Sequence, residues 1–199
     1  MNPDAIHIAI LAGGQSQRMG RDKALLHLEG QTLIEHVIAA VRPLAQSTFI
    51  VGDPATYTHF GLAVHPDRYP AIGPIGGLYT ALSLDLGPIL LLACDLPFLT
   101  PDFLNFLVRK RGPYQVVVPR TDNGLEPLCA LYEPCCLSTI ESAIQCGHLS
   151  MRALLSQLIL YEIPTEAWQP YDERGLLFAN LNTPEEYQQA ANTIRGKIL

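Results

Sequence analysis

The sequence predicts an α/β fold, a three-layer sandwich in which helices cover both faces of a mostly parallel central sheet. Two apolar runs carry this expectation: residues 6–11 (IHIAIL) precede a Gly pair, and residues 89–93 (ILLLA) lie between a Pro and an Asp. Continuous apolar runs are typical of strands that are buried on both faces. Residues 48–51 and 116–118 predict two more strands, and a helix should begin within the Gly- and Pro-rich segment 73–77. Strands that alternate with helices favour a parallel sheet, which binds ligands beyond the carboxyl ends of its strands.

The other expected helices have recognisable start signals. Thr32 and Glu35 form a capping-box pattern, which predicts a helix over residues 32–44. Residues 100–102 (TPD) supply an N-cap, a Pro at the first helical position and an acid in the first turn, so a second helix should start there. Residues 183–186 (TPEE) repeat this pattern and predict a C-terminal helix.

Size, charge and cysteine content restrict the class of protein. A chain of 199 residues with 48% hydrophobic and 16% charged residues fits one globular domain, residues 1–199. A net charge of -6 without a basic stripe disfavours nucleic-acid binding, because phosphate neutralisation dominates that affinity. Five cysteines without a C-x-x-C pair disfavour both a zinc site and a disulfide framework. No apolar run is long enough to span a membrane, so we expect a cytoplasmic monomer without membrane contact.

The loop over residues 11–23 (LAGGQSQRMGRDK) combines three glycines with three cations directly after the first predicted strand. Glycines let a ligand approach the backbone, and successive free N–H groups form a nest for an anion. Arg18 and Lys23 add positive charge, and lysine suits a triphosphate as a point charge. The string matches neither G-x-x-x-x-G-K-[ST] nor G-x-G-x-x-G. By its residues alone it is either a phosphate-binding loop or a surface loop with solvated cations.

Two acids stand where ligands of such a sheet would bind. Asp95 directly follows the apolar run 89–94, and Mg²⁺ is often held by one or two carboxylates together with substrate phosphates. The alternative for Asp95 is a turn acid ahead of Pro97. Asp67 precedes the segment 73–77, and its alternative is an exposed turn acid paired with Arg68.

The loop 11–23 resembles the signature of the sugar-nucleotidyltransferase-like superfamily. Its form L-A-G-G-x-S-x-R-M-G-x-D-K is similar to that of the molybdenum cofactor guanylyltransferase family in particular. The resemblance implies a Rossmann-like nucleotidyltransferase fold. It implies guanine-nucleotide contacts at the start of the loop, from Leu11, Ala12, Gly13 and Gly14. It also implies that Lys23 meets the phosphates and that Arg18 steadies the pyrophosphate leaving group.

Other segments extend this resemblance over most of the chain. Residues 94–97 (CDLP) resemble the family's C-D-x-P element, whose Asp binds the metal, which implies Mg²⁺ on Asp95. Residues 73–78 (GPIGGL) resemble its G-P-L-x-G element, and the resemblance implies nucleotide contacts from Asp67 and Gly77. Asp53 stands where relatives often carry Asn.

The resemblance implies that the N-terminal half binds the nucleotide and that the C-terminal half binds molybdopterin. Residues 126–132 (EPLCALY) resemble H-P-L-x-A-L-Y, with Glu126 in the place of His. Residues 147–152 resemble G-x-x-S-x-R, which gives the hypothesis that Arg152 contacts the phosphate of molybdopterin. Asn182 lies in N-x-N-T-P-E and would reach the site from a strand end. The alternatives are a solvated helix residue for Arg152 and a polar residue beside a cap for Asn182.

The resemblance implies that GMP is transferred from GTP to molybdenum-molybdopterin with release of pyrophosphate, which makes GTP and the pterin the substrates. It implies partners among other proteins of molybdenum-cofactor biosynthesis. A cytidylyltransferase for the same cofactor is one alternative, although the Gly13-Gly14 pair favours guanine. A sugar-phosphate nucleotidyltransferase and a non-catalytic nucleotide- or cofactor-binding module are the others, and retention of Lys23 and Asp95 disfavours the module.

Overall fold

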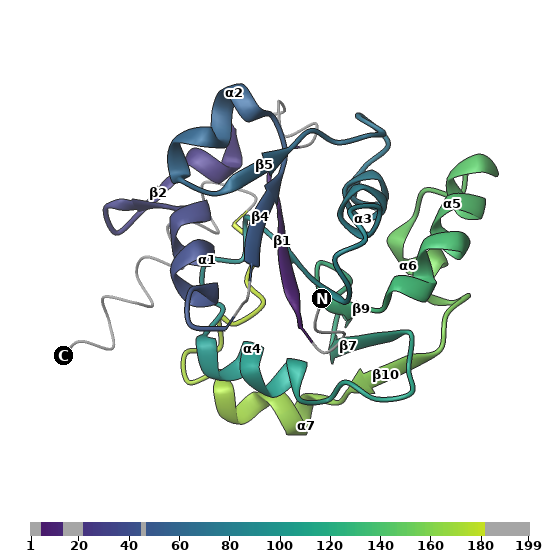
Figure 1. Cartoon of the computed structure of the whole chain (residues 1–199). Coiled ribbons are helices and arrows are strands. Elements are labelled where there is room, and N and C mark those ends of the chain that lie inside the picture. Colours follow the sequence, from purple (N-terminus) through teal and green to yellow (C-terminus); the bar gives the residue numbers. More distant parts are fainter. Residues whose placement is uncertain (1–4, 14–21, 45–46, 182–199) are drawn as a thin grey trace.

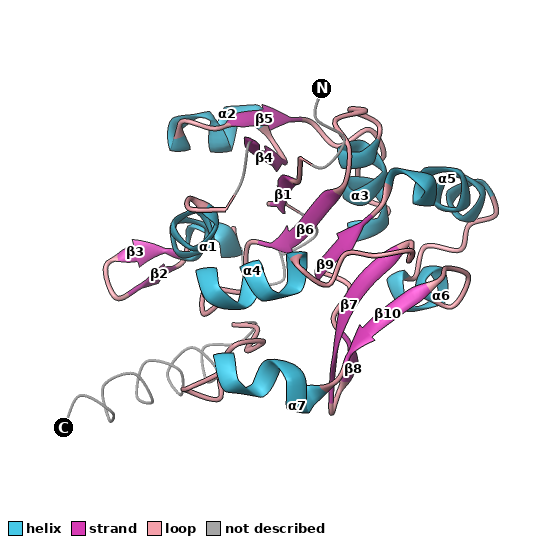
Figure 2. Ribbon diagram, turned by 60° about the horizontal axis from the view of Figure 1, so that its bottom comes forward, coloured by secondary structure: helices cyan, strands magenta, loops and turns pink. Residues whose placement is uncertain are grey.

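The computed structural model describes residues 5–13, 22–44 and 47–181 of the chain. Within these ranges eight strands form one sheet (Figure 1), in the order β10-β7-β9-β6-β1-β4-β5, with β8 paired to β7 (Figure 2). The strands of this sheet are β1 (His7–Leu11), β4 (Ser47–Val51), β5 (Ala63–His65), β6 (Ile89–Ala93), β7 (Val116–Thr121), β8 (Gly124–Leu125), β9 (Cys129–Tyr132) and β10 (Leu160–Ile163). A separate hairpin consists of β2 (His27–Leu28) and β3 (Gln31–Thr32).

The parallel part of the sheet brings four strand ends to one edge. β1 pairs in parallel with β4 and with β6, and β4 pairs in parallel with β5. β9 is antiparallel to both β6 and β7, whereas β10 is parallel to β7. The sheet is thus mixed but mostly parallel, which confirms the predicted fold class. The carboxyl ends of β5, β4, β1 and β6 lie side by side, at the edge where such sheets bind ligands.

Helices cover both faces of this sheet, as a three-layer sandwich requires (Figure 2). The α-helices are α1 (Leu33–Val41), α2 (Pro54–Tyr57), α3 (Pro74–Leu82), α4 (Pro101–Val108), α5 (Leu137–Gln145), α6 (Met151–Leu155) and α7 (Thr165–Trp168). One apolar cluster joins α1, α4 and α7 to one face, and a second joins α3, α5 and α6 to the other. The residues of β1 show how one strand contributes to both clusters. Ile8 and Ile10 belong to the first cluster and Ala9 to the second, because successive strand residues face opposite sides of the sheet.

The local signals in the sequence correspond to observed elements. The predicted strands are β1, β4, β6 and the first part of β7, and the predicted helix starts at 73–77 and 100–102 are those of α3 and α4. The C-terminal helix expected from residue 183 lies outside the described residues. In the described ranges, no helix is long and apolar enough to cross a membrane.

Helix α1 has the capping box that the sequence predicts. The N–H of Thr32 donates to Oε2 of Glu35 at 2.6 Å, and the N–H of Glu35 donates to the Thr32 hydroxyl at 3.4 Å. The helix ends at Val41, earlier than the expected end at residue 44. Pro43 explains the difference, because proline has no N–H with which to continue the helical hydrogen bonds.

Candidate active site

A cleft of about 890 Å³ opens at the four adjacent strand ends. It is formed by the residues that follow β1, β4, β5 and β6 and by the start of α3. Seven residues predicted from the sequence line it: Leu11, Ala12, Gly13, Lys23, Asp67, Gly77 and Asp95. The volume is in the range of roughly 300–1,000 Å³ that small-molecule and cofactor sites occupy.

A second cavity of about 430 Å³ lies between the β2–β3 hairpin, the loop after β6 and the segment 170–177. Its charged lining in the described residues consists of four carboxylates and one guanidinium, from Glu29, Asp102, Asp172, Glu173 and Arg174. This acidic balance disfavours a polyphosphate there. The cleft at the strand ends is the candidate nucleotide site, because the residues predicted from the sequence line it.

Two glycines pack closely against the chain at the point where it leaves β1. The N–H of Ala12 donates to the last carbonyl of β4 at 2.9 Å. A Cβ added to Gly52 would lie 2.2 Å from the Ala12 oxygen, and one added to Gly77 would lie 2.7 Å from Cδ2 of Leu11. Gly13 has φ +126°, a conformation that side-chain-bearing residues rarely adopt. The cleft floor at Ala12 therefore requires glycine at position 52, and a side chain at position 77 would displace the Leu11 side chain.

Lys23 enters the cleft from a capped turn. It begins the 3₁₀ turn Lys23–Leu25, and the N–H of Ala24 donates to Oδ1 of Asp22 at 3.0 Å. The other carboxylate oxygen of Asp22 accepts a hydrogen bond from the hydroxyl of Tyr57, a buried residue at the end of α2. The lysine is thus presented by a segment that is attached to a second element of the fold.

Asp95 is a partly buried carboxyl group close to Lys23. Burial raises its pKa, while the positive charge of Lys23 and a backbone N–H lower it. In the described part of the chain no three His, Cys, Asp or Glu side chains gather as a metal cage. A single carboxylate at the wall of a cleft fits Mg²⁺ that takes its other ligands from phosphate oxygens and water.

The thiol beside this acid is not a nucleophile at neutral pH. Burial and the neighbouring carboxylates of Asp95 and Asp22 raise the pKa of Cys94 far above its ordinary value. Because the thiolate and not the thiol attacks, Cys94 contributes to the cleft wall by packing rather than by covalent chemistry.

Asp67 is a fixed carboxylate on the opposite wall. Its Oδ1 accepts hydrogen bonds from the N–H of Tyr69 at 2.9 Å and from the Thr80 hydroxyl at 3.1 Å. Gly76 leaves room for it, since a Cβ there would lie 3.1 Å from both carboxylate oxygens. Its partners therefore come from the following turn and from α3, which holds the carboxylate in one orientation beside the cleft.

Arg152 lies elsewhere, on α6, outside the residues that line the cleft. Its Nη2 donates to the carbonyl of Asn123 in the β7–β8 hairpin at 3.0 Å. Glu126 follows this hairpin and accepts a hydrogen bond from the Thr121 hydroxyl at 3.1 Å. Burial raises the pKa of Glu126, whereas the Thr121 hydrogen bond and the charge of Arg152 lower it. A cation and an acid thus flank the end of the hairpin.

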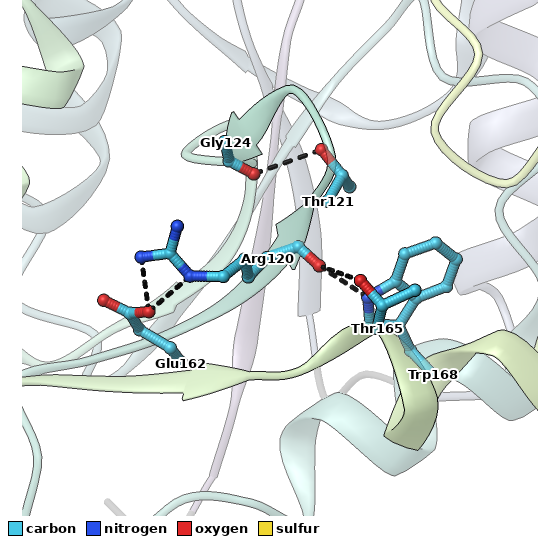
Figure 3. Close-up of polar contacts among 6 residues, drawn as sticks. All are labelled: Arg120, Thr121, Gly124, Glu162, Thr165 and Trp168. Atoms are coloured by element: carbon cyan, nitrogen blue, oxygen red, sulfur yellow. Dashed lines mark hydrogen bonds and ion pairs between the residues drawn. The ribbon is translucent and has the colours of Figure 1, made fainter.

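The hairpin is attached to α7 at Arg120 (Figure 3). The Arg120 carbonyl accepts hydrogen bonds from the Trp168 indole N–H at 2.9 Å and the Thr165 hydroxyl at 3.2 Å. Its guanidinium pairs with Glu162 of β10 at 2.6 Å. These contacts fix the end of β7 and so the hairpin that Arg152 and Glu126 flank.

Three residues predicted from the sequence, Gly14, Arg18 and Asn182, lie outside the described residues. Sequence reasoning gave no role to Asp22, Tyr57 or Thr80, which orient Lys23 or Asp67. Asp22 had a signal, since it precedes Lys23 in the glycine-rich string. Tyr57 and Thr80 had none, because their partners are distant in the sequence.

A glycine-shaped strand end, a lysine and a partly buried carboxylate around one cleft define an α/β protein that binds a nucleotide and acts on its phosphates. Residues 8–161 match the model of the MobA-like NTP transferase domain. The chain therefore belongs to the MobA-like NTP transferase family.

Relatives in this family match over nearly the whole chain. The probable molybdenum cofactor guanylyltransferase of Clostridium perfringens is 32% identical over 191 residues, which cover 90% of this chain and 93% of the relative. The molybdenum cofactor guanylyltransferase of Desulfosudis oleivorans is 32% identical over 200 residues and covers 98% and 99% of the two chains.

Solved structures agree with this assignment. The molybdopterin-guanine dinucleotide biosynthesis protein A of Archaeoglobus fulgidus superposes with a TM-score of 0.82 at 28% identity, over 96% of this chain and 99% of that one. The 2-C-methyl-D-erythritol 4-phosphate cytidylyltransferase of Thermus thermophilus has a TM-score of 0.68 at 16% identity, over 96% and 99% of the chains. The latter likeness shows the shared fold alone.

Proposed function

We propose that this chain is a molybdenum cofactor guanylyltransferase, which joins GMP from GTP to molybdenum-bound molybdopterin and releases pyrophosphate. The observation that carries the proposal is the position of Lys23 and Asp95 in one cleft, at the ends of adjacent parallel strands, in a chain 32% identical to such enzymes. The product would be the molybdopterin guanine dinucleotide.

The nucleotide would lie along the cleft between the end of β1 and the start of α3. The backbone of residues 11–14 would contact the guanosine part, since glycines there allow close approach. Gly77 would leave space for the base or ribose, and Asp67 would accept hydrogen bonds from the nucleotide with the orientation that Thr80 gives it. Lys23 would hold the triphosphate, and Arg18 would stabilise charge on the leaving pyrophosphate.

Asp95 would hold Mg²⁺ together with phosphate oxygens and water. Bound there, Mg²⁺ would neutralise charge on the phosphates and polarise the α-phosphorus. The positive charge of Lys23 serves the same arrangement, because it lowers the pKa of Asp95 and so favours the ionised carboxylate that a metal ligand must be.

The reaction needs positioning and charge stabilisation rather than a protein nucleophile. An oxygen of the terminal phosphate of molybdopterin forms the new bond to the α-phosphorus, and the bond from that phosphorus to the bridging oxygen of pyrophosphate breaks. The attacking phosphate is already ionised at neutral pH, so no side chain has to remove a proton from it. Both reactants are anions, which makes the cations of the cleft the main contribution of the protein.

The acceptor would bind toward the second half of the chain. Leu128 lines the cleft directly after the β7–β8 hairpin, and Glu126 and Arg152 flank that hairpin. Arg152 would meet the phosphate of molybdopterin, and Asn182 would contribute from the C-terminal side. The proposal also places the protein in the cytoplasm as a monomer, in contact with other proteins of molybdenum-cofactor biosynthesis.

Pyrophosphate release tests the proposal. Purified protein with Mg²⁺ and molybdenum-loaded molybdopterin should release pyrophosphate with GTP and not with CTP. Lys23→Ala should lower the rate about 10²–10³-fold, because one well-placed electrostatic contact is lost. Lys110→Ala, which removes a lysine at the end of α4 outside the cleft, is the matched control and should leave the rate unchanged.

Other outcomes separate the alternatives. Turnover with CTP alone would make the protein a cytidylyltransferase. Tight GTP binding without turnover would favour a binding module. A folded Lys23→Ala variant with the wild-type rate would remove Lys23 from the reaction.

A further inference from the structure

A buried tyrosine outside the cleft contacts the segment that carries the cation. Tyr57 is 1% exposed and is not among the residues that line the cleft. Its hydroxyl donates to Oδ2 of Asp22, which is 35 residues away in the sequence. Burial and the Asp22 carboxylate raise the pKa of Tyr57, so the phenol remains protonated and can only act as the donor toward this acid.

The two oxygens of Asp22 have separate partners. Oδ1 accepts the N–H of Ala24 and so caps the 3₁₀ turn that starts with Lys23, whereas Oδ2 accepts from Tyr57. The cap fixes the local geometry of the turn, and Ala24 in its middle is fully buried in the apolar cluster on that face of the sheet. The Tyr57 hydrogen bond connects the turn to α2, which follows directly from the end of β4.

Tyr57 is itself held in place. A Cβ on Gly52 would lie 2.9 Å from two carbon atoms of its ring, so the ring packs directly on the glycine that follows β4. The same glycine lies against the carbonyl of Ala12 at the end of β1. A single packed unit therefore joins the floor of the cleft to the base of the Lys23 turn.

We propose that Tyr57 is a positioning residue: its hydroxyl, acting through Asp22, holds the Lys23 turn at the distance from the β1 end that a bound triphosphate requires. The inference rests on the proposed function, since it concerns the affinity for GTP. Tyr57 touches no reacting atom, and its effect passes through Lys23. Phenylalanine at this position would keep the ring packing and remove only the hydroxyl.

A double-mutant cycle on GTP binding tests the inference. Calorimetry would give the dissociation constant for wild type, Tyr57→Phe, Lys23→Ala and the double variant, each with Mg²⁺. Tyr57→Phe should weaken GTP binding about five- to tenfold, because the Lys23 segment would then have to be ordered when the nucleotide binds. In the Lys23→Ala background, Tyr57→Phe should alter the GTP affinity less than about twofold. The effects of two substitutions that act through the same contact are not additive.

Tyr132→Phe is the matched control. Tyr132 is also fully buried, and its hydroxyl donates to a backbone carbonyl, that of Pro127, at 2.8 Å. Loss of the Tyr132 hydroxyl should also lower the melting temperature, while GTP affinity stays within about twofold of wild type. A general loss of stability would lower GTP affinity in both variants, whereas a positioning role would do so only in Tyr57→Phe.

A second variant tests the path through Asp22 without altering Tyr57. Asp22→Ser keeps a capping oxygen for the turn and removes the second oxygen that Tyr57 needs. Asp22 also lines the cleft, so its own effect on GTP affinity includes the loss of a charge there. The test is the added change: Tyr57→Phe in the Asp22→Ser background should have no further effect on GTP affinity.

The outcomes distinguish this inference from the proposed function. The positioning role would be overturned if Tyr57→Phe weakened GTP binding equally in the presence and absence of Lys23. It would also be overturned if the folded Tyr57→Phe variant bound GTP with wild-type affinity. Either result would leave the guanylyltransferase proposal intact. Failure of the wild-type chain to bind GTP would overturn both.

Discussion

Asp95 combines two opposing requirements in one side chain. As the proposed metal ligand it must be ionised, yet burial beside the cleft raises its pKa. A carboxyl group whose pKa is higher in the folded state than in the unfolded state stabilises the fold most when it is protonated, at pH values below its unfolded pKa. This contribution is lost as the pH rises through the folded pKa. At neutral pH the ionised Asp95 therefore lowers the stability of the protein, although the charge of Lys23 offsets part of the effect.

Asp95→Asn should separate these requirements. Because asparagine resembles the protonated acid, the variant should melt at a higher temperature than wild type at neutral pH. The difference should shrink at acidic pH, because wild-type Asp95 gains its proton as the pH falls through its raised pKa. Pyrophosphate release should fall about 10²–10³-fold in the same variant. Thermal melts at neutral and acidic pH, together with the rate assay, make the comparison.

The exposed hairpin residue Asp122 supplies the control for this prediction, since Asp122→Asn should change stability by less than about 0.5 kcal/mol. A folded Asp95→Asn variant that melts below wild type at neutral pH would show that the contacts of the ionised carboxylate outweigh its burial.

At the scale of single elements, helix α1 shows how a few residues determine where a helix begins. Its capping box satisfies two backbone N–H groups, those of Thr32 and Glu35, that the helix itself cannot bond. Thr32→Ala should lower the free energy of unfolding by about 1 kcal/mol, the usual effect of losing an N-cap. Urea unfolding followed by circular dichroism measures the change.

Glu35→Gln should cost less than Thr32→Ala, because glutamine also fits the capping box. An unfolding free energy of Thr32→Ala within a few tenths of a kcal/mol of wild type would mean that water replaces the cap at no cost. The lowered pKa of Glu35, caused first by its hydrogen bonds to Thr32, adds a pH test. The stabilisation that this lowered pKa reflects is present at pH values above the unfolded pKa of Glu35. It is lost as the pH falls through the folded pKa.

Elements with strong local signals could be predicted from the sequence, and those set by distant partners could not. β6 is an apolar run buried at every residue, and the starts of α1 and α4 have side-chain caps, so each is determined locally. β9 has only four residues, and its pairing with β6 and β7 fixes it as an antiparallel strand inside the sheet. β10 is partly exposed and depends in the same way on β7.

At the scale of the whole molecule, sheet topology explains which parts of the site the sequence could predict. Leu11 ends β1 and Asp95 follows β6, and neighbouring parallel strands bring such residues together. No rule of this kind relates Tyr57 to Asp22, because their contact depends on how α2 packs against the turn after β1. The same topology places the β7–β8 hairpin and Arg152 outside the cleft, on the side of the second half of the chain.

The separation of the cleft from the β7–β8 hairpin and Arg152 predicts where each substrate protects the backbone from hydrogen exchange. The cleft is lined by residues from 11–13, 22–23, 51–54, 66–77 and 93–95, with Leu128 as the contribution of the second half. GTP with Mg²⁺ at about 100 times its dissociation constant should stabilise the fold by about 2.7 kcal/mol, which slows exchange that requires global unfolding everywhere. Exchange through local opening should slow only in the segments that line the cleft, because these lose exposure on binding.

Molybdopterin should protect a different set of amides, in the β7–β8 hairpin and around Arg152, since those groups flank the proposed acceptor side. Mass spectrometry of peptides after short exchange times would resolve the two patterns, and Lys23→Ala should weaken the GTP pattern while leaving the pterin pattern unchanged. Protection of the hairpin by GTP alone would mean that the nucleotide crosses from one half of the sheet to the other. In that case the two halves would bind one ligand jointly, and the acceptor would have to approach the α-phosphorus from another side of the cleft.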